Sequence, residues 1–219
     1  MTAHTHGDGH QHPHPRQPDV EDRPLTYHMA LTAAVAELLV AKGVVTADEL
    51  RRTVEDIDSR HPGDGARVVA RAWMDTAFKA RLLEDVNDAA AELGIDCGGI
   101  PIRAVENTRR LHNLVVCTLC SCYPRMLIGL PPDWYKARAY RSRAVREPRA
   151  VLREFGVTLP DDVELVVHDS TADMRYLVVP ARPDGTDGWS EEALAAIVTR
   201  DCMIGTALPR SDAPRSGGG

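Results

Sequence analysis

The segment Val115–Tyr135 reads VVCTLCSCYPRMLIGLPPDWY and holds three cysteines, Cys117, Cys120 and Cys122, within six residues. If the backbone turns here, three thiols at this spacing converge on one point. A disulfide framework would spread its cysteines along the chain, and the total of five cysteines is odd. We therefore interpret the cluster as a metal or redox site.

Three sulfurs are fewer ligands than common structural metal sites use, because structural zinc and iron–sulfur clusters normally take four. There is no second CxxC pair, so His112 and Cys202 are the plausible distant fourth ligands. The close spacing of Cys120, Ser121 and Cys122 also brings two peptide amides beside the metal position. A strongly Lewis-acidic ion could bind those two nitrogens and three sulfurs, with one position left open for chemistry.

The two ends of the chain differ from its middle in composition. Residues 1–24 hold five of the nine histidines and almost nothing apolar, so we expect a disordered, His-rich tail. This tail is either a metal-collecting arm or, in the interpretation that we favour, a solvated segment. The last residues, 208–219, are rich in Ser, Pro and Gly and are expected to be flexible.

The middle of the chain is helical first and rich in strands later. A capping box at Thr46 and Glu49 opens the second of the expected helices, and His61–Gly63 should break it. Short β-branched runs after Gly94 indicate strands. The expected helices are residues 26–42, 46–60, 66–73, 76 to about 94, 147–155 and 191–199, and the expected strands are residues 102–106, 114–117, 164–169 and 174–180.

This order of elements predicts the α+β class, with an N-terminal helical arm followed by a mixed domain. We expect the arm, residues 25–64, to contact a partner, and we expect the mixed domain to span residues 65–207. The predicted domain carries the cysteine cluster.

Charge and hydropathy exclude several classes of protein. With 26 Lys and Arg against 32 Asp and Glu, the net charge of −6 argues against general nucleic-acid binding. The Arg-rich stretch Lys136–Arg153 is therefore interpreted as a partner-facing or solvated surface. No apolar run approaches the ~20 residues of a spanning helix, so no membrane insertion is expected. The N-terminus lacks the pattern of a secretory signal, and we expect a cytoplasmic protein.

The segment Val115–Tyr135 resembles the metal claw of the nitrile hydratase α subunit. The resemblance extends in the same order over about residues 26–206, and it implies a layered α/β/β/α metal-binding domain of that type. Further matching segments are Gly65–Trp73, Arg81–Gly94, Val105–Thr108, Gly129–Tyr135, Tyr140–Arg143, Met174–Tyr176 and Gly185–Gly205.

The resemblance implies a ligand set for the claw. Cys117, Cys120 and Cys122 would give sulfur ligands, and Ser121 and Cys122 would give backbone nitrogens. In the family the two later cysteines are oxidised, so Cys120 would be a sulfinic acid and Cys122 a sulfenic acid. Cys120, Ser121 and Cys122 are then the candidate catalytic residues. Thr118 matches the cobalt branch of the family, which implies non-corrin Co(III), with Fe(III) as the alternative.

The resemblance also implies a reaction and partners. Water would add to a small-molecule nitrile to give the amide, at an ion that polarises the nitrile or lowers the pKa of bound water. Negatively charged sulfur oxygens are costly to bury without donors, and in the family arginines of a β-type subunit supply them. Metallation in the family commonly needs an activator, so we expect a hetero-oligomer and a further accessory protein.

One residue departs from the nitrile hydratase pattern. Arg125 stands where these enzymes commonly have Trp, which replaces an apolar wall by a fixed charge. We expect Arg125 to contact substrate, on a polar, bulky or heteroaromatic nitrile. Arginine at this position is similar to the thiocyanate hydrolase γ subunit, which converts thiocyanate to carbonyl sulfide and ammonia. Three-subunit nitrile hydratases of the toyocamycin type are also similar.

Two alternatives to nitrile hydration stay open at this point. A thiocyanate hydrolase γ-type subunit would share the claw but act on an anion. A non-catalytic metal-binding protein, such as a metal chaperone, would use the claw and the His-rich tail to hold exchangeable metal. Oxygen on Cys120 and Cys122 would favour catalysis, whereas unmodified thiols would favour the chaperone.

Overall fold

The computed structural model describes residues 26–209, and contacts divide the chain between Arg52 and Thr53 into two compact units. The predicted His-rich tail, residues 1–24, lies outside the described residues, as does most of the predicted tail over residues 208–219. The boundaries predicted at residues 64 and 207 stay predictions.

From residue 26 onward, two capped helices come first, as predicted. α1 (Tyr27–Ala41) begins after Thr26, whose hydroxyl accepts a backbone hydrogen bond of the first turn at 3.2 Å. α2 (Ala47–Ser59) begins with the predicted capping box. The Thr46 hydroxyl accepts the backbone N–H of Glu49 at 3.1 Å, and the Glu49 carboxylate accepts the backbone N–H of Thr46 at 2.8 Å.

Three helices follow where the sequence predicted two. α3 (Pro62–Met74) begins at the proline that we expected only to break the previous helix, because proline suits a first turn and the side chain of His61 caps it. α4 (Thr76–Glu84) and α5 (Val86–Glu92) divide the stretch predicted as one helix. The division falls at Asp85, which has an extended backbone and caps α5 with its carboxylate.

The described part of the chain has four strands, which form two parallel pairs. β1 (Ile102–Glu106) pairs with β4 (Arg175–Val179), and β2 (Leu111–Val116) pairs with β3 (Glu164–Asp169). All four predicted strands exist, but β2 begins earlier than predicted and ends one residue before Cys117. The claw therefore starts where a strand ends.

Between β2 and residue 209, the structure has six helices. The two predicted ones exist, although the second is shorter than predicted and a short helix capped by Thr199 follows it. The three helices directly after the claw were not predicted, because two of them have only four residues and show no periodicity. The six helices are α6 (Arg125–Ile128), α7 (Asp133–Lys136), α8 (Arg138–Arg146), α9 (Pro148–Glu154), α10 (Glu191–Ala196) and α11 (Arg200–Met203).

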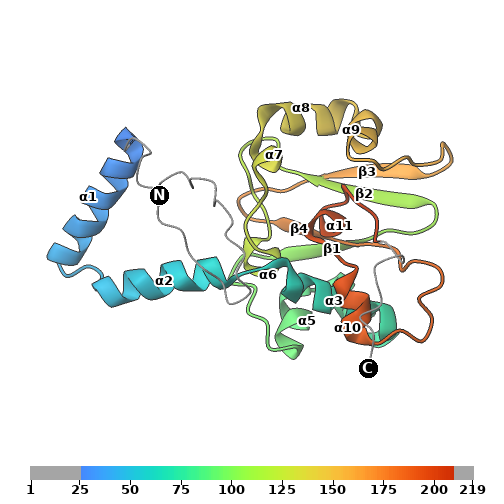
Figure 1. Cartoon of the computed structure of the whole chain (residues 1–219), viewed down its shortest axis with the longest axis horizontal. Coiled ribbons are helices and arrows are strands. Elements are labelled where there is room, and N and C mark those ends of the chain that lie inside the picture. Colours follow the sequence, from blue (N-terminus) through green and yellow to red (C-terminus); the bar gives the residue numbers. More distant parts are fainter. Residues whose placement is uncertain (1–25, 210–219) are drawn as a thin grey trace, which may run out of the picture. The chain divides into compact units, whose positions relative to one another are not determined.

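The helices of the second unit cover the strands from two sides. In Figure 1, α8 and α9 lie along the β2–β3 pair, and contacts join α8 to β2 and α9 to β3. α4 and α5 contact β1 on the other side, and α3 packs against α10. This mixture of helices and strands agrees with the predicted α+β class.

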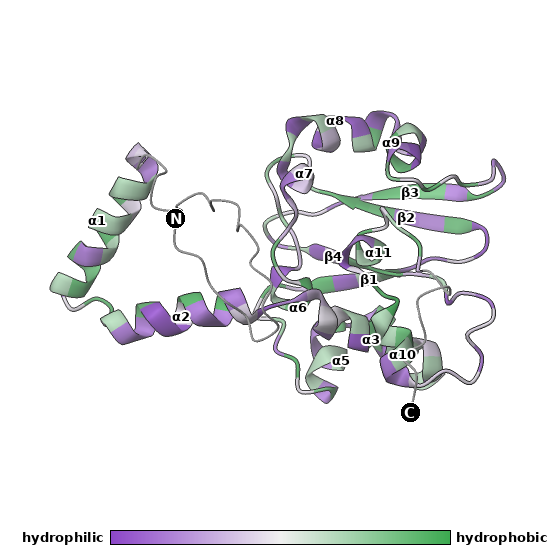
Figure 2. Cartoon of the chain, in the orientation of Figure 1, coloured by the Kyte–Doolittle hydropathy of each residue, from purple (hydrophilic) through white to green (hydrophobic). Residues whose placement is uncertain are grey.

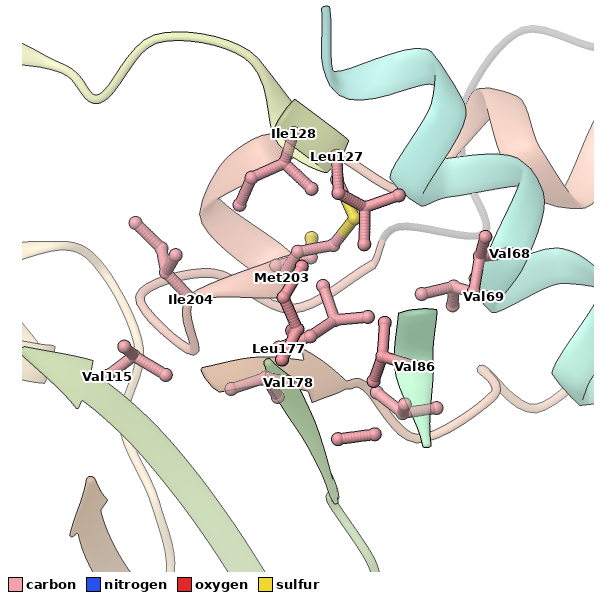
Figure 3. Close-up of a cluster of buried hydrophobic side chains, with 14 of the residues drawn as sticks. Val68, Val69, Val86, Val115, Leu127, Ile128, Leu177, Val178, Met203 and Ile204 are labelled. Carbon is pink, nitrogen blue, oxygen red and sulfur yellow. The ribbon is translucent and has the colours of Figure 1, made fainter. Parts of the chain in front are cut away.

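The core lies where α3, α6, α11 and β4 meet. Figure 3 shows Val68, Leu127, Leu177 and Met203 from these four elements pointing toward one another, and none of them is exposed to solvent. Burial of one such side chain contributes about 1.5–3 kcal/mol. Because α6 directly follows the claw, its buried Leu127 fixes the chain on the far side of the cysteines.

Gly205 makes a close backbone contact next to this core. Its φ is +85°, and an added Cβ would lie 2.0 Å from the carbonyl oxygen of Asn113 in β2. The backbone N–H of Val115 also donates to the carbonyl of Ile204 at 3.0 Å. Glycine alone tolerates the left-handed backbone and leaves room for the carbonyl of Asn113. It therefore allows the C-terminal segment to pack directly against β2.

Hydropathy varies between the helices. Figure 2 shows α8 as largely hydrophilic, whereas α1 carries many apolar residues, several of them exposed. Among residues 26–209, no helix combines the length and the apolar character that crossing a bilayer requires.

Candidate metal centre

The strand β2 delivers the first cysteine of the claw, which we define as residues Cys117–Cys122. The last residues of β2 are fully buried, and Cys117, the next residue, has an exposed fraction of 0%. Cys120 is exposed, and Cys122 is half-buried. The claw therefore leads from the core to the surface, and its three thiols have different access to solvent.

The three sulfurs of the claw converge. The Sγ atoms of Cys117 and Cys120 are 3.5 Å apart, those of Cys120 and Cys122 are 3.2 Å apart, and all three lie within 4.8 Å of one another. Two sulfurs bound at ~2.3 Å to one ion lie about 3.3 Å apart at a right angle and about 3.8 Å apart in a tetrahedron. Neighbouring sulfurs here fit the right-angled, octahedral arrangement better.

Backbone amides of the claw also face the sulfurs. The N–H of Cys120 donates to Sγ of Cys117 at 3.2 Å. The backbone amides of Ser121 and Cys122 also contribute to lowering the pKa of the Cys120 thiol, so they lie close to its sulfur. The two nitrogens predicted as ligands therefore lie beside the sulfur cluster, and the donor set present is three sulfurs with two adjacent amides.

The acidities of the two later thiols differ. The hydrogen bond with Cys122, followed by the one with Cys117, lowers the pKa of Cys120 to about 7. Burial, followed by the hydrogen bond with Cys120, raises the pKa of Cys122 to about 12. Cys120 is therefore the first of the pair to ionise, and the thiolate is the form that binds metal.

Two buried tyrosines tether the backbone on either side of the claw. The hydroxyl of Tyr140 donates to the carbonyl of Val115 at 2.7 Å, and the hydroxyl of Tyr135 donates to the carbonyl of Cys122 at 2.9 Å. Burial raises the pKa of both phenols, so both keep the proton that these bonds use. Sequence reasoning missed both tyrosines, because no local pattern indicates hydrogen bonds to carbonyls so distant in sequence.

An aromatic cluster supports these two tyrosines. The ring of Trp134 lies 4.9 Å from that of Tyr140 and 4.6 Å from that of Phe155. The ring of Tyr123 meets that of Tyr135 edge-on at 5.1 Å. Such pairs hold the rings in place beyond what burial alone does. The hydroxyls that anchor the claw are therefore fixed by packing.

A pocket of ≈ 590 Å³ opens beside the claw. Residues 120–122 form one part of its wall. Three cationic side chains, those of Arg125, Lys136 and Arg175, also line the pocket, and no Asp or Glu is among its lining residues. Arg125 was a predicted substrate contact, whereas Lys136 and Arg175 were not identified. The apolar part of the wall comes from Ile100, Ile102, Met126, Leu130 and Pro131.

The other candidate ligands lie outside the sulfur group. Within residues 26–209, no further His, Cys, Asp or Glu joins the three thiols. The Nε2 atom of His112 lies 2.7 Å from the carbonyl oxygen of Gly205, and Sγ of Cys202 lies 3.2 Å from the hydroxyl oxygen of Thr199. Neither residue supplies the fourth ligand that the sequence left open. Cys97 lines the pocket, and burial raises its pKa to about 11.

The fold and the site define a class of protein. The chain is an α+β protein with three convergent cysteine sulfurs at the end of a buried strand, in a pocket lined by cations.

The sequence profile described as "Nitrile hydratase, alpha chain" matches residues 26–207. The chain belongs to this family.

Two kinds of enzyme subunit are similar to this chain in sequence. The alpha subunit of the low-molecular weight cobalt-containing nitrile hydratase of Rhodococcus rhodochrous is 48% identical over 182 residues, which cover 82% of this chain and 88% of the relative. The gamma subunit of thiocyanate hydrolase of Thiobacillus thioparus is 43% identical over 192 residues, which cover 82% of this chain and 79% of the relative. A solved structure of a recombinant thiocyanate hydrolase with partially modified cobalt centres has a TM-score of 0.82 and 41% sequence identity. The match covers 86% of this chain and 93% of the solved chain.

Proposed function

We propose that this chain is the metal-bearing catalytic subunit of a nitrile hydratase, which adds water to a nitrile to give the amide. The observation that carries the proposal is the convergence of three cysteine sulfurs at the wall of a cation-lined pocket. Membership of the nitrile hydratase alpha chain family supports the same reaction.

The proposed ligands are the sulfurs of Cys117, Cys120 and Cys122 and the backbone nitrogens of Ser121 and Cys122. The proposed ion is non-corrin Co(III), which the cobalt-containing relatives support, and Fe(III) is the alternative. When bound, a trivalent ion supplies Lewis acidity. We further propose that Cys120 is a sulfinic acid and Cys122 a sulfenic acid in the mature subunit.

The chain's own residues have the remaining tasks at this site. The proposed catalytic residues are Cys120, Ser121 and Cys122, which line the pocket. Met126 and Leu130 line the same pocket and can exclude water from the organic part of a nitrile. Its cations can stabilise negative charge that develops on the nitrile nitrogen when water adds to the carbon.

Thiocyanate hydrolysis is the second candidate, because one observation favours it. Arg125, Lys136 and Arg175 line the pocket and no carboxylate does, which suits an anionic substrate. Arg125 and Arg175 have no ion pair among the described residues, and Lys136 has a long one of 3.7 Å with Asp133. We propose that Arg125 contacts the substrate in either reaction, and that a bulky or heteroaromatic nitrile is the nitrile accepted.

Steady-state assays of the complete enzyme decide between the two reactions. The chain is co-purified with its β-type partner and supplied with a heteroaromatic nitrile or with thiocyanate. We expect amide from the nitrile as the faster reaction. Carbonyl sulfide and ammonia from thiocyanate, without amide from the nitrile, would establish the second candidate. Exchangeable cobalt on unmodified thiols, without turnover of either compound, would favour a metal chaperone.

We propose that the helical arm binds the β-type subunit, or more than one such subunit. Leu31, Val35 and Leu38 are spaced along one side of α1 and are about half exposed. Exposed apolar side chains of this kind are typical of a helix that packs against another chain. The β-type subunit would also bring arginines to the oxidised cysteines, and an activator would deliver the metal.

The Arg-rich surface of α8 is a second proposed partner contact. Arg138, Arg141 and Arg146 line a hollow of ≈ 640 Å³ together with Leu119 of the claw, whose exposed fraction is 88%. These three arginines have no ion pair among the described residues, whereas Arg143 binds two glutamates of its own chain. An apolar residue beside unpaired cations fits a protein partner better than a nucleic acid or a membrane.

A further inference from the structure

The parallel pairing of β2 and β3 ends where the claw begins. The last pair in register is Val116 with Asp169, and the backbone N–H of Ser170 donates to the carbonyl of Val116 at 2.7 Å. The next residue of the β2 chain is Cys117. Beyond this point the backbone leaves the strand, so something other than the ladder must direct it.

The carboxylate of Asp169 takes over from the backbone ladder. Its Oδ1 accepts the backbone N–H of Thr118 at 2.9 Å, and its Oδ2 accepts the hydroxyl of Thr118 at 2.5 Å. In a continuing parallel ladder that N–H would donate to a backbone carbonyl of the neighbouring strand. A side chain that accepts it instead lets the chain turn and still satisfies the amide. Hydrogen bonds to a charged carboxylate are also stronger than neutral ones.

The third polar group of Thr118 is held as well. Its carbonyl accepts a hydrogen bond from Nη1 of Arg141 in α8 at 3.4 Å. The Nε atom of the same guanidinium is buried and has no partner within residues 26–209. The N–H, hydroxyl and carbonyl of Thr118 are thus all tied to elements outside the claw, between the two thiols Cys117 and Cys120.

We propose that Asp169 is a positioning residue for the metal centre, which acts through Thr118 to fix the turn between Cys117 and Cys120. The inference rests on the proposed function for the identity of the metal, but not for the geometry. A claw held in shape before metal arrives does not have to be ordered during binding, which strengthens binding. Residues behind the ligands commonly change metal affinity by about 10–100-fold.

Thr118 receives a specific role in this proposal. Its hydroxyl donates to Asp169, so it acts on the metal through the conformation of the loop. Serine keeps the hydroxyl, whereas valine keeps the shape of threonine and loses the hydrogen bond. Thr118→Ser and Thr118→Val therefore form a matched pair, and Asp169→Ala removes both acceptors. Asp184→Asn removes a carboxylate charge from an exposed pair with Arg109 and serves as the control.

The first measurement uses the full chain without metal. Iodoacetamide alkylation of Cys117, which is fully buried, reports whether the turn opens. We expect Asp169→Ala and Thr118→Val to raise the rate of Cys117 alkylation about tenfold, because the turn opens more often. Thr118→Ser and Asp184→Asn should leave it unchanged. Equal rates in wild type and Asp169→Ala would overturn the proposal, as would equal rates in Thr118→Ser and Thr118→Val.

The second measurement titrates the same full-length proteins with Co²⁺ and follows the thiolate-to-cobalt absorption band. Asp169→Ala and Thr118→Val should bind Co²⁺ about 10–100-fold more weakly and with a shifted band, at an unchanged melting temperature. Thr118→Ser should restore wild-type affinity. Wild-type affinity and an unshifted band in Asp169→Ala would overturn the proposal. If the wild-type chain binds no Co²⁺, the proposed function fails, and the alkylation rates still decide the role of Asp169.

Discussion

At the scale of single residues, the three cysteines of the claw differ although they would share one ion. Cys117 is fully buried, Cys120 is exposed with its pKa lowered to about 7, and Cys122 is half-buried with its pKa raised to about 12. Oxidation of a thiol follows its thiolate character and exposure. Cys120 is thus the thiol most open to oxidation, and Cys117 is protected, whereas the raised pKa of Cys122 does not by itself favour the sulfenic acid proposed there.

Arg125 gives the first prediction at this scale. Arg125→Trp restores the residue common in nitrile hydratases and removes one pocket cation, so we expect the ratio of nitrile to thiocyanate turnover to rise about tenfold or more. The ratio of the two kcat/KM values in the complete enzyme measures this change. Lys79→Met, which removes a cation that pairs with Glu106 and does not line the pocket, is the control. An unchanged ratio would show that Arg125 does not contact the substrate.

His112 gives a prediction on pH dependence. Burial lowers the pKa of His112 and of His168 in the folded chain. Between the unperturbed histidine pKa of ~6.5 and these lowered pKa values, the unfolded chain therefore binds more protons than the folded chain. The free energy of unfolding should therefore decrease as the pH falls from 7 to 5, by at most about 1.4 kcal/mol per pH unit for each histidine. His112→Gln should be less stable at pH 8 but show a smaller slope in denaturant titrations. A slope equal to that of wild type would contradict this assignment.

At the scale of elements, Gly205 links the C-terminal segment to β2. Gly205→Ala should lower the free energy of unfolding by about 3 kcal/mol or more, because its Cβ would meet the carbonyl of Asn113 at 2.0 Å in addition to backbone strain. Gly185→Ala has a similar φ of +78° but nothing within 4 Å, so it should cost only about 1–2 kcal/mol. Equal losses in the two variants, by urea titration, would exclude the steric contact.

The elements also show what the sequence could predict. The capping box at Thr46 and the four β-branched runs are local signals, and the helix and strands that they predict exist. The division of a helix at Asp85 depends on whether this residue caps a new helix or continues the previous one. Local helix propensity does not distinguish these two outcomes well. The strand pairing and the one-turn helices after the claw depend on long-range packing, and no local pattern in the sequence predicts them.

The same distinction applies to the candidate site. The spacing of Cys117, Cys120 and Cys122 is itself a local signal, and their sulfurs converge. The groups that hold them, Tyr135 and Asp169, reach the claw from distant segments through hydrogen bonds to backbone groups. The partner in each hydrogen bond is a backbone group, which nearly every residue type has. The amino-acid sequence therefore does not indicate these contacts.

At the scale of the whole molecule, the chain is an incomplete enzyme in our proposal. Its claw carries an exposed Leu119 beside arginines that have no ion pair within residues 26–209, and its arm exposes several apolar side chains. Both surfaces are costly to leave in water and suit a protein partner. We therefore expect activity to depend on assembly with the β-type subunit.

The arm gives the prediction at this scale. Leu31→Lys combined with Leu38→Lys should weaken binding of the β-type subunit at least about tenfold, because both side chains would leave an apolar contact. Both residues are exposed in the chain, so its melting temperature should change little. Ala33→Lys, at an exposed position on the opposite side of the same helix, is the control for added charge. Co-purification yield and sedimentation measure assembly, and an unchanged complex would remove the arm from the interface.

In the proposed function, cobalt bound by the claw hydrates nitriles, and the amide rate per bound cobalt measures this dependence. Complexes with the β-type subunit are prepared at several cobalt contents and assayed with one nitrile. We expect an amide rate proportional to bound cobalt, up to one ion per chain, and no activity in Cys117→Ser. Amide formation that does not depend on cobalt, or a cobalt-filled complex that forms no amide, would contradict it.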